Sequence, residues 1–120
     1  MTASVRPIDA SFEVAERGEH TVLTARGELD VASVPAFREL LLPLVQSATP
    51  SVVVDLSGVR FIDSAGLRVI VDGLTNARRR DGDLRLACPH ASLRRTFEIT
   101  GLDQVLAIHA SVEEATAPTA

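Results

Sequence analysis

The stretch Asp55-Leu-Ser-Gly-Val-Arg-Phe-Ile-Asp-Ser-Ala-Gly-Leu67 lies in the middle of the chain, between two segments with different apolar patterns. The preceding residues 51–55 form a short apolar run, which is typical of a buried parallel strand. After the stretch, apolar residues recur at i, i+3, i+4 and i+7, which predicts a helix with one buried face. These residues are Leu67, Ile70, Val71 and Leu74. The residues between strand and helix predict a turn-rich link that brings Ser64 to the first turn or the cap of the helix.

A serine at this position has a particular electrostatic environment. The first turn of a helix has backbone N–H groups without partners inside the helix, and it is the positive end of the helix dipole. Both features favour a negatively charged group. The sequence therefore predicts that a phosphate would be well placed at Ser64.

Composition limits the classes of protein that this chain can belong to. Its 120 residues predict one domain with a real core. The net charge of −4 and pI of about 5.3 argue against nucleic acid as the main partner. All twelve basic residues are arginine, which excludes a P-loop lysine, Schiff-base chemistry and Ser-Lys catalysis. A single cysteine, Cys88, predicts a reducing compartment, and the absence of a long apolar run or leader predicts a cytoplasmic protein with no membrane contact.

Taken in order, the chain predicts an α/β fold. Alternating residues on either side of Gly18 indicate an antiparallel hairpin, which ends at Gly27-Glu-Leu-Asp30. Helices are expected from Ser33 or Val34, with Pro43 disturbing the last turn, and from the central serine to about Arg80. A strand ending at Cys88 is expected next, followed by a short helix with Ser92 as its N-cap and Gly101 as its left-handed C-cap. In this helix Leu93, Phe97 and Ile99 are expected to face inward. The chain then predicts a strand over residues 104–108 and a closing helix with a capping box of Ser111 and Glu114.

The predicted order is ββαβαβαβα, which implies a mixed sheet that is mostly parallel, with an antiparallel hairpin at its N-terminal side. We expect a loose lead-in at residues 1–9, one domain at 10–117 and a short tail at 118–120.

Enzyme and metal chemistry find little support in the sequence. A nucleophile elbow needs glycine two residues before and two after its serine. Gly66 follows Ser64 at that distance, but Ile62 occupies the other position. The glycine-rich phosphate loop lacks its Gly-Lys pair. One cysteine and three scattered histidines do not have the spacing of a metal site, so we expect no metal, no cofactor and no catalytic residue.

A response-regulator receiver domain is a more serious alternative. The length and class agree, and Asp55 at the end of an apolar strand resembles a phosphate-accepting aspartate. A receiver domain, however, begins with one strand and a helix and carries a lysine after its last strand. This chain begins with a hairpin and has no lysine.

The segments Gly27-Glu-Leu-Asp30 and 55–67, taken together with the predicted element order, resemble a bacterial anti-sigma factor antagonist that consists of a single STAS domain. The resemblance covers about residues 10–117. It implies that the serine matching Ser64 is phosphorylated by an anti-sigma factor with serine kinase activity. The unphosphorylated form would bind that partner and free a sigma factor, and a PP2C-type phosphatase would restore it. The resemblance also implies a monomer when the protein is free, and no direct contact with nucleic acid.

The surface expected to contact the partner surrounds this serine. It consists of Asp30, Gly58, Val59, Phe61, Asp63, Ser64, Ala65, Gly66 and Arg68. Some of these residues have simpler interpretations. Asp63 or Ser64 could be a helix cap, Asp30 a cap at the start of the preceding helix, and Gly66 a point of close backbone approach.

Three further questions stay open at this stage. Ser57 is most simply a turn residue, although some family members have a second phosphorylation site there. Val59 and Phe61 would support an interface only if their side chains are exposed. A STAS domain can also act as a fixed scaffold or accessory subunit of a signalling or transport complex, and a small nucleotide-binding domain is a remote alternative.

Overall fold

The structure is a computed structural model that describes residues 10–118. The predicted element order is confirmed, with one additional 3-10 turn. The expected lead-in at residues 1–9 and the last two residues of the expected tail lie outside the described residues. The elements are β1 (Ala10–Arg17), β2 (His20–Leu29), α1 (Val34–Val45), β3 (Ser51–Ile62), α2 (Ser64–Arg79), β4 (Asp83–Ala87), α3 (Ala91–Ile99), the 3-10 turn η1 (Leu102–Gln104), β5 (Ala107–His109) and α4 (Val112–Ala115).

The strands form one mixed sheet in the order β1-β2-β3-β4-β5. The β1–β2 pair is antiparallel and all other pairs are parallel. Gly18 has a φ of 63° in the hairpin turn, a conformation that glycine adopts without strain. The predicted α/β class, with its N-terminal antiparallel hairpin, is therefore confirmed.

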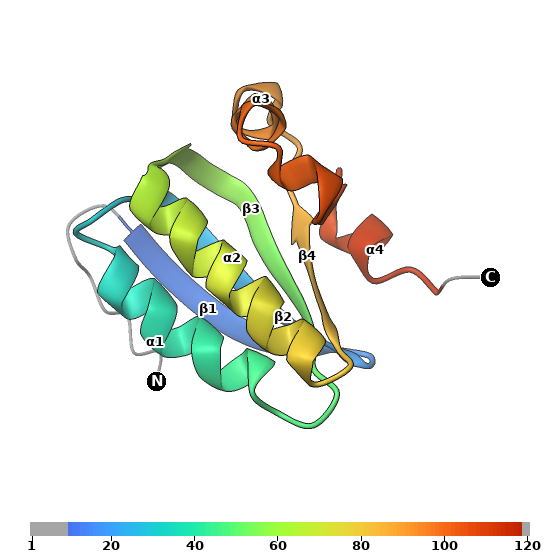
Figure 1. The fold of residues 1–120 in the computed structure, drawn as a ribbon. Helices are drawn as coiled ribbons and strands as arrows, with labels where there is room; N and C mark the ends of the chain where they lie inside the picture. The colour runs from blue at the N-terminus through green and yellow to red at the C-terminus, as the bar shows by residue number, and fades with distance from the viewer. Residues whose placement is uncertain (1–9, 119–120) are drawn as a thin grey trace.

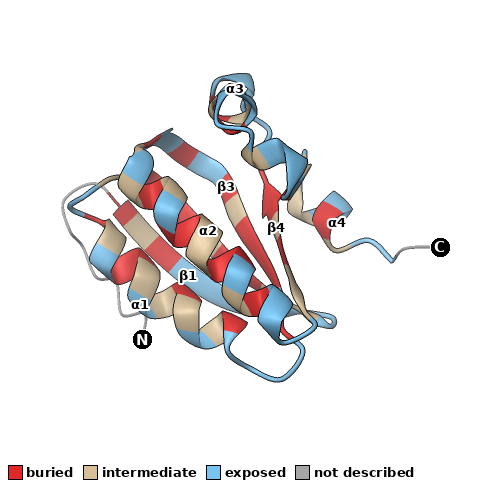
Figure 2. Ribbon diagram, in the orientation of Figure 1, coloured by how far each residue is buried: buried red, intermediate tan, exposed pale blue. Residues whose placement is uncertain are grey.

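The two sides of the sheet are covered differently. Helices α1 and α2 pack on one face, and Figure 1 shows them lying next to each other along the sheet. Their buried stripes, visible in Figure 2, enclose the main core. On the other face a small cluster forms beneath α4. Its members are Val22, Val53, Ala87 and Ala115, with Val112 packed against them.

Strand β3 is longer than the sequence predicts. The expected strand ended at Asp55, but β3 continues to Ile62, so the region expected to be a turn-rich link is mostly strand. Two register shifts against β2 accompany this extension, one between Thr24 and Arg26 and one between Gly27 and Glu28. At each shift β3 has one residue more than β2, which is the pattern of a β-bulge. Bulges allow turn-forming residues such as Ser57 and Gly58 to remain within a strand.

Helix α3 differs from its prediction at both ends. It begins at Ala91 with His90 as its cap, so the prediction of Ser92 as cap was wrong. Leu93 and Phe97 are buried as expected, but Ile99 is 74% exposed. At 3.6 residues per turn, Ile99 lies about 200° around the helix from Phe97 and cannot share its buried face.

The C-terminal elements agree in part. Gly101 has a φ of 78° after α3, as predicted for a left-handed cap. The last strand starts at Ala107, later than predicted, because the preceding residues form η1. Ser111 caps α4 by accepting a hydrogen bond from the Glu114 amide at 3.1 Å, and the Glu114 carboxylate accepts one from the amide of Ala110 at 3.3 Å. The capping box is thus present, with its return bond shifted by one residue.

Candidate phosphorylation and partner-binding site

The carboxyl ends of β2 and β3 meet at one end of the sheet. Leu29 pairs with Ile62 in the parallel register, and the Asp63 amide donates to the Leu29 carbonyl at 3.1 Å. Asp30 and Asp63 each follow directly after these paired residues. The two acidic residues that the sequence singled out are therefore neighbours.

Asp63 is the N-cap of α2. Its Oδ1 accepts hydrogen bonds from the amides of Ala65 at 2.9 Å and Gly66 at 3.1 Å. Ser64 is the first residue of the helix, and its side chain is exposed. Within residues 10–118 the Ser64 hydroxyl forms no hydrogen bond, so it is accessible to another molecule.

This cap changes the electrostatic argument made from the sequence. The two amides that could have bound a phosphate at Ser64 are already occupied by the Asp63 carboxylate. A phosphate on the serine would retain the attraction of the helix dipole, but it would lie next to a like charge. The site therefore offers a phosphate moderate support and clear repulsion.

Asp30 has a structural role in the turn before α1. Its Oδ1 accepts hydrogen bonds from the amides of Ala32 at 3.0 Å and Ser33 at 3.2 Å. The buried Ser33 hydroxyl ties the same turn to β2 by donating to the Glu28 carbonyl at 2.7 Å. Asp30 thus organises the start of α1, as one of its two sequence interpretations proposed, although the formal N-cap is Ser33.

Gly66 is buried where α2 passes close to the end of β2. A Cβ atom at this position would lie 2.8 Å from the Leu29 carbonyl oxygen and 2.7 Å from Cγ1 of Ile62. Real Cβ contacts are not this short, so the close backbone approach predicted for Gly66 is confirmed. This glycine lets the helix start, and with it Ser64, lie directly against the sheet.

Arg68 lies one helical turn after Ser64 on the same face of α2. Its side chain is 75% exposed and its Nε is 3.5 Å from a carboxylate oxygen of Asp72. The other oxygen of Asp72 is 2.9 Å from Nη2 of Arg38 on α1. Arg68 is thus solvent-accessible and partly held by an ion pair.

The apolar residues of the expected surface divide into exposed and buried positions. Phe61 is 50% exposed, whereas Val59 is 2% exposed and belongs to the main core. The Val59 side chain is therefore unavailable to a partner in this structure. Since side chains alternate along a strand, Phe61 points to the face opposite Ile62, away from α2. Gly58 is exposed on β3, beside the side chain of Arg26.

Val31 is a surface residue that the sequence reasoning missed. It is 77% exposed in the turn directly after Asp30. The sequence contains a signal for it: Val31 is an apolar residue that follows an acidic residue at the end of a strand. In a parallel sheet this strand end lies at the same edge as Ser64.

Ser57 does not share the position of Ser64. Its hydroxyl donates to Oδ1 of Asp55 at 2.7 Å, and its carbonyl oxygen is 2.6 Å from Nε2 of His90. Ser57 is exposed but held within the bulged part of β3. The Ser57 hydroxyl is therefore hydrogen-bonded, whereas the Ser64 hydroxyl has no hydrogen-bond partner among the described residues.

Other kinds of site find no counterpart in the described part of the chain. Among residues 10–118, no group of three or more His, Cys, Asp or Glu side chains could hold a metal ion. None of the helices in that range has the length and apolar character needed to cross a membrane. Cys88 is buried, and its burial raises the pKa of the thiol.

Comparisons with known proteins identify the family of this chain. A family model described as "STAS domain" matches residues 11–115, and the chain belongs to the STAS-domain family. It is 36% identical over 106 residues to the protein named "Anti-sigma-B factor antagonist" of Staphylococcus aureus (strain NCTC 8325 / PS 47), covering 88% of this chain and 98% of the relative. The resemblance to anti-sigma factor antagonists found in the sequence is therefore confirmed.

Solved structures share the fold. An anti-sigma factor antagonist from Mycobacterium paratuberculosis superposes with a TM-score of 0.82 at 24% identity, covering 92% of this chain and 93% of the other. The anti-sigma factor antagonist SpoIIAA in its unphosphorylated form gives a TM-score of 0.72 at 23% identity, covering 88% and 92%. The phosphorylated form of the Bacillus SpoIIAA gives 0.67 at 23% identity, covering 88% and 96%.

Proposed function

We propose that this protein is an anti-sigma factor antagonist that works as a phosphorylation switch. Its unphosphorylated form binds an anti-sigma factor with serine kinase activity and thereby frees a sigma factor. Phosphorylation at Ser64 ends the binding, and a PP2C-type phosphatase restores it. The observation that carries this proposal is the exposed Ser64 hydroxyl at the first position of α2. The names of the relatives add support, because the Staphylococcus protein is an antagonist of an anti-sigma factor.

The switch follows from charge. A phosphoryl group adds about −1.5 to −2 charges at neutral pH. At Ser64 this charge would join the carboxylates of Asp63 and Asp30, at a helix start where the amides of Ala65 and Gly66 are already bonded to Asp63. A partner packed over the serine would have to desolvate the phosphate, and any facing carboxylate would repel it. A change of about 3 kcal/mol in binding free energy lowers affinity more than a hundredfold.

The switch requires no large rearrangement of the fold. The unphosphorylated and phosphorylated forms of SpoIIAA both share the fold of this chain. Ser64 also lies outside the core, so a modification there leaves the packing of α2 on the sheet intact. Binding is therefore controlled at the surface.

The proposed contact surface is centred on the α2 start. It includes Asp30, Gly58, Phe61, Asp63, Ser64, Ala65 and Arg68 from the sequence, and Val31 from the structure; Gly66, also expected there, is buried. Val31 and Phe61 supply the exposed apolar area that interfaces need. Because Phe61 points to the other face of the sheet, a partner that reaches it must extend around the ends of β2 and β3. Val59 and the backbone of Gly66 support this surface from beneath.

Incubation with ATP and candidate anti-sigma kinases, followed by mass spectrometry, tests the proposal. We expect one phosphate on Ser64, none on Ser64→Ala, and loss of kinase binding in the phosphorylated protein. Ser64→Asp and Ser64→Glu should bind at least tenfold more weakly, an effect of about 1.4 kcal/mol. Ser92→Asp, at an exposed serine on α3, is the matched control and should bind normally.

Other outcomes point to other functions. Normal binding by Ser64→Asp and Ser64→Glu, together with no label on Ser64, would indicate a fixed scaffold or accessory subunit. ATP turnover by the isolated chain would contradict a non-enzymatic role and favour a nucleotide-hydrolysing domain.

A further inference from the structure

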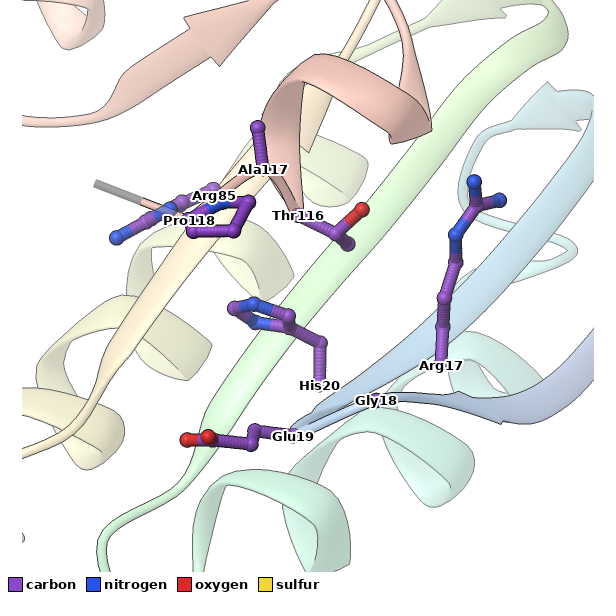
Figure 3. Close-up of a pocket in the computed structure, with 8 residues that line it drawn as sticks. All are labelled: Arg17, Gly18, Glu19, His20, Arg85, Thr116, Ala117 and Pro118. Carbon is purple, nitrogen blue, oxygen red and sulfur yellow. The ribbon is translucent and has the colours of Figure 1, made fainter. Parts of the chain in front are cut away.

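A hollow of about 580 Å³ opens at the end of the sheet where the β1–β2 hairpin lies, and it does not belong to the Ser64 site. Its volume is in the range of small-molecule sites. The hairpin forms one wall, and the segment after α4 forms another (Figure 3). The lining residues are Arg17, Gly18, Glu19, His20, Arg85, Thr116, Ala117 and Pro118.

Three nitrogen-bearing side chains from three different strands line this hollow. Arg17 comes from the end of β1, His20 from the start of β2 and Arg85 from the middle of β4. In Figure 3 the His20 ring projects from the hairpin toward the segment that follows α4, the Arg17 side chain extends from the hairpin on one side of that ring, and the guanidinium group of Arg85 lies on the other side. Arg17 and His20 flank the same hairpin turn, and the fold brings Arg85, which is distant in the sequence, to the lining of the same hollow.

The ring of His20 is held in position by the sheet. Its Nδ1 lies 2.7 Å from the hydroxyl oxygen of Ser51 at the start of β3. When Nδ1 accepts the hydroxyl proton, the neutral ring carries its own proton on Nε2. Among the described residues nothing is hydrogen-bonded to Nε2, so this N–H is available to a ligand in the hollow.

The arginines differ in how far they are neutralised. The Nη1 of Arg85 donates to the Ala115 carbonyl at 3.0 Å and its Nε is 3.6 Å from Asp83, so the side chain is fixed and partly paired. Within residues 10–118, Arg17 has no carboxylate at ion-pair distance. Among the described residues, Glu19 is the single carboxylate of the lining. The hollow therefore carries a local positive excess, although the whole chain has a net charge of −4.

From this juxtaposition we propose that the hollow binds a phosphate-type dianion, either inorganic phosphate or the phosphate of a small monoester. Arg17 supplies a guanidinium fork that matches phosphate oxygens, His20 supplies a single donor, and Arg85 supplies a fixed positive charge. Ala117 and Pro118 offer an apolar wall against which the organic part of an ester would lie. This ligand site is independent of the proposed switch at Ser64.

Titration of the full ¹⁵N-labelled chain by NMR tests the proposal, with inorganic phosphate and glycerol phosphate as probes and sodium chloride at equal ionic strength as reference. We expect saturable amide shifts confined to Gly18, Glu19, His20 and Thr116. Stronger binding of glycerol phosphate than of inorganic phosphate would identify a monoester as the ligand, and equal binding would identify phosphate itself.

Variants separate a built site from general charge attraction. Arg17→Gln should weaken binding about tenfold, as expected for loss of a charge-assisted hydrogen bond, and Arg17→Glu should abolish it. Both changes are on an exposed hairpin residue, and unchanged circular dichroism would show that the fold is kept. Arg95→Gln, at an exposed arginine on α3, should bind like the wild type. Shifts that do not saturate, or an equal loss in Arg95→Gln, would overturn the proposal.

Discussion

At the level of single residues, Gly66 determines where α2 can begin. Its missing side chain lets the helix lie against the Leu29 carbonyl. In the interior of a helix, alanine is normally more stabilising than glycine by about 0.5–1 kcal/mol. At this position the added methyl group would meet backbone oxygen, which cannot move away without distorting β2.

We therefore predict that Gly66→Ala lowers the free energy of unfolding by about 1–3 kcal/mol, as overpacked sites do. Urea denaturation followed by circular dichroism would measure the change. Ser64→Ala is the control, because its exposed side chain should change stability by no more than about 0.5 kcal/mol. A Gly66→Ala protein as stable as the wild type would show that the contact relaxes freely.

Asp63 can be tested for its cap and its charge separately. Asp63→Ala removes the acceptor of two amide hydrogen bonds and should cost about 0.5–2 kcal/mol of stability. Asp63→Asn keeps an oxygen acceptor without the charge, so it should retain most of the stability. Chemical denaturation of the three proteins side by side would measure both effects, and equal loss in the two variants would mean that charge, not capping geometry, stabilises this helix start.

At this scale the sequence predicted that Ser64 lies at the start of a helix, but not the hydrogen bonds around it. The position of Ser64 at a helix start followed from apolar spacing alone. That Asp63 occupies the Ala65 and Gly66 amides could not be inferred, because aspartate and serine both cap helices well. Exposure was also beyond the sequence, since Val59 and Phe61 have similar apolar character and opposite burial.

Among the elements, β3 shows why boundaries were harder to predict than element types. Ser57 and Gly58 are common in turns, and that local preference argued for a link after Asp55. Pairing with β2 overrides the preference, since the bulges let the strand continue to Ile62. Helix α3 is a different case, because helical geometry alone places Ile99 about 200° from the buried Phe97 and leaves it in solvent.

Helix α1 contains an internal proline, and we expect its replacement to raise the stability of the protein. Pro43 is exposed and α1 continues two residues beyond it to Val45. Proline lacks the N–H that would bond the carbonyl of Glu39, which costs an interior helix position about 3 kcal/mol. Replacement also frees the unfolded chain, which opposes the gain by about 0.4–1 kcal/mol.

Pro43→Ala should therefore raise the free energy of unfolding by about 2–2.6 kcal/mol. Thermal and urea unfolding would measure it. Pro35→Ala is a matched control, because Pro35 lies in the first turn of α1, where no intrahelical N–H bond is lost. A larger gain at Pro35 than at Pro43 would contradict this account.

Across the whole molecule, the absence of lysine and tyrosine simplifies the alkaline titration. Between about pH 9 and 11, the usual lysine and tyrosine transitions are missing, and arginine remains charged. Cys88 is the single thiol of the chain, so its ionisation dominates this pH range.

Burial raises the pKa of Cys88 above the ordinary thiol value of 9.0, because desolvation disfavours the thiolate. A backbone hydrogen bond at His90 and the positive charge of Arg94 lower this pKa, and the negative charge of Asp55 raises it further. The unfolded chain then loses this proton at lower pH than the folded chain does. Stability contributed by the neutral thiol is complete below pH 9 and falls as the pH rises from 9 toward the folded pKa.

We predict a steady loss of urea resistance from about pH 9 to 10.5 in the wild type and a nearly flat profile in Cys88→Ala. The variant will be less stable overall, because a buried side chain is shortened, so the slope with pH is the quantity to compare. Alkylation by iodoacetamide should also be slow in the folded protein and fast in urea, since the thiolate is the reactive form and the native structure disfavours it. An identical pH slope in both proteins would place the alkaline loss elsewhere in the chain, and the raised pKa of Cys88 would then have no part in it.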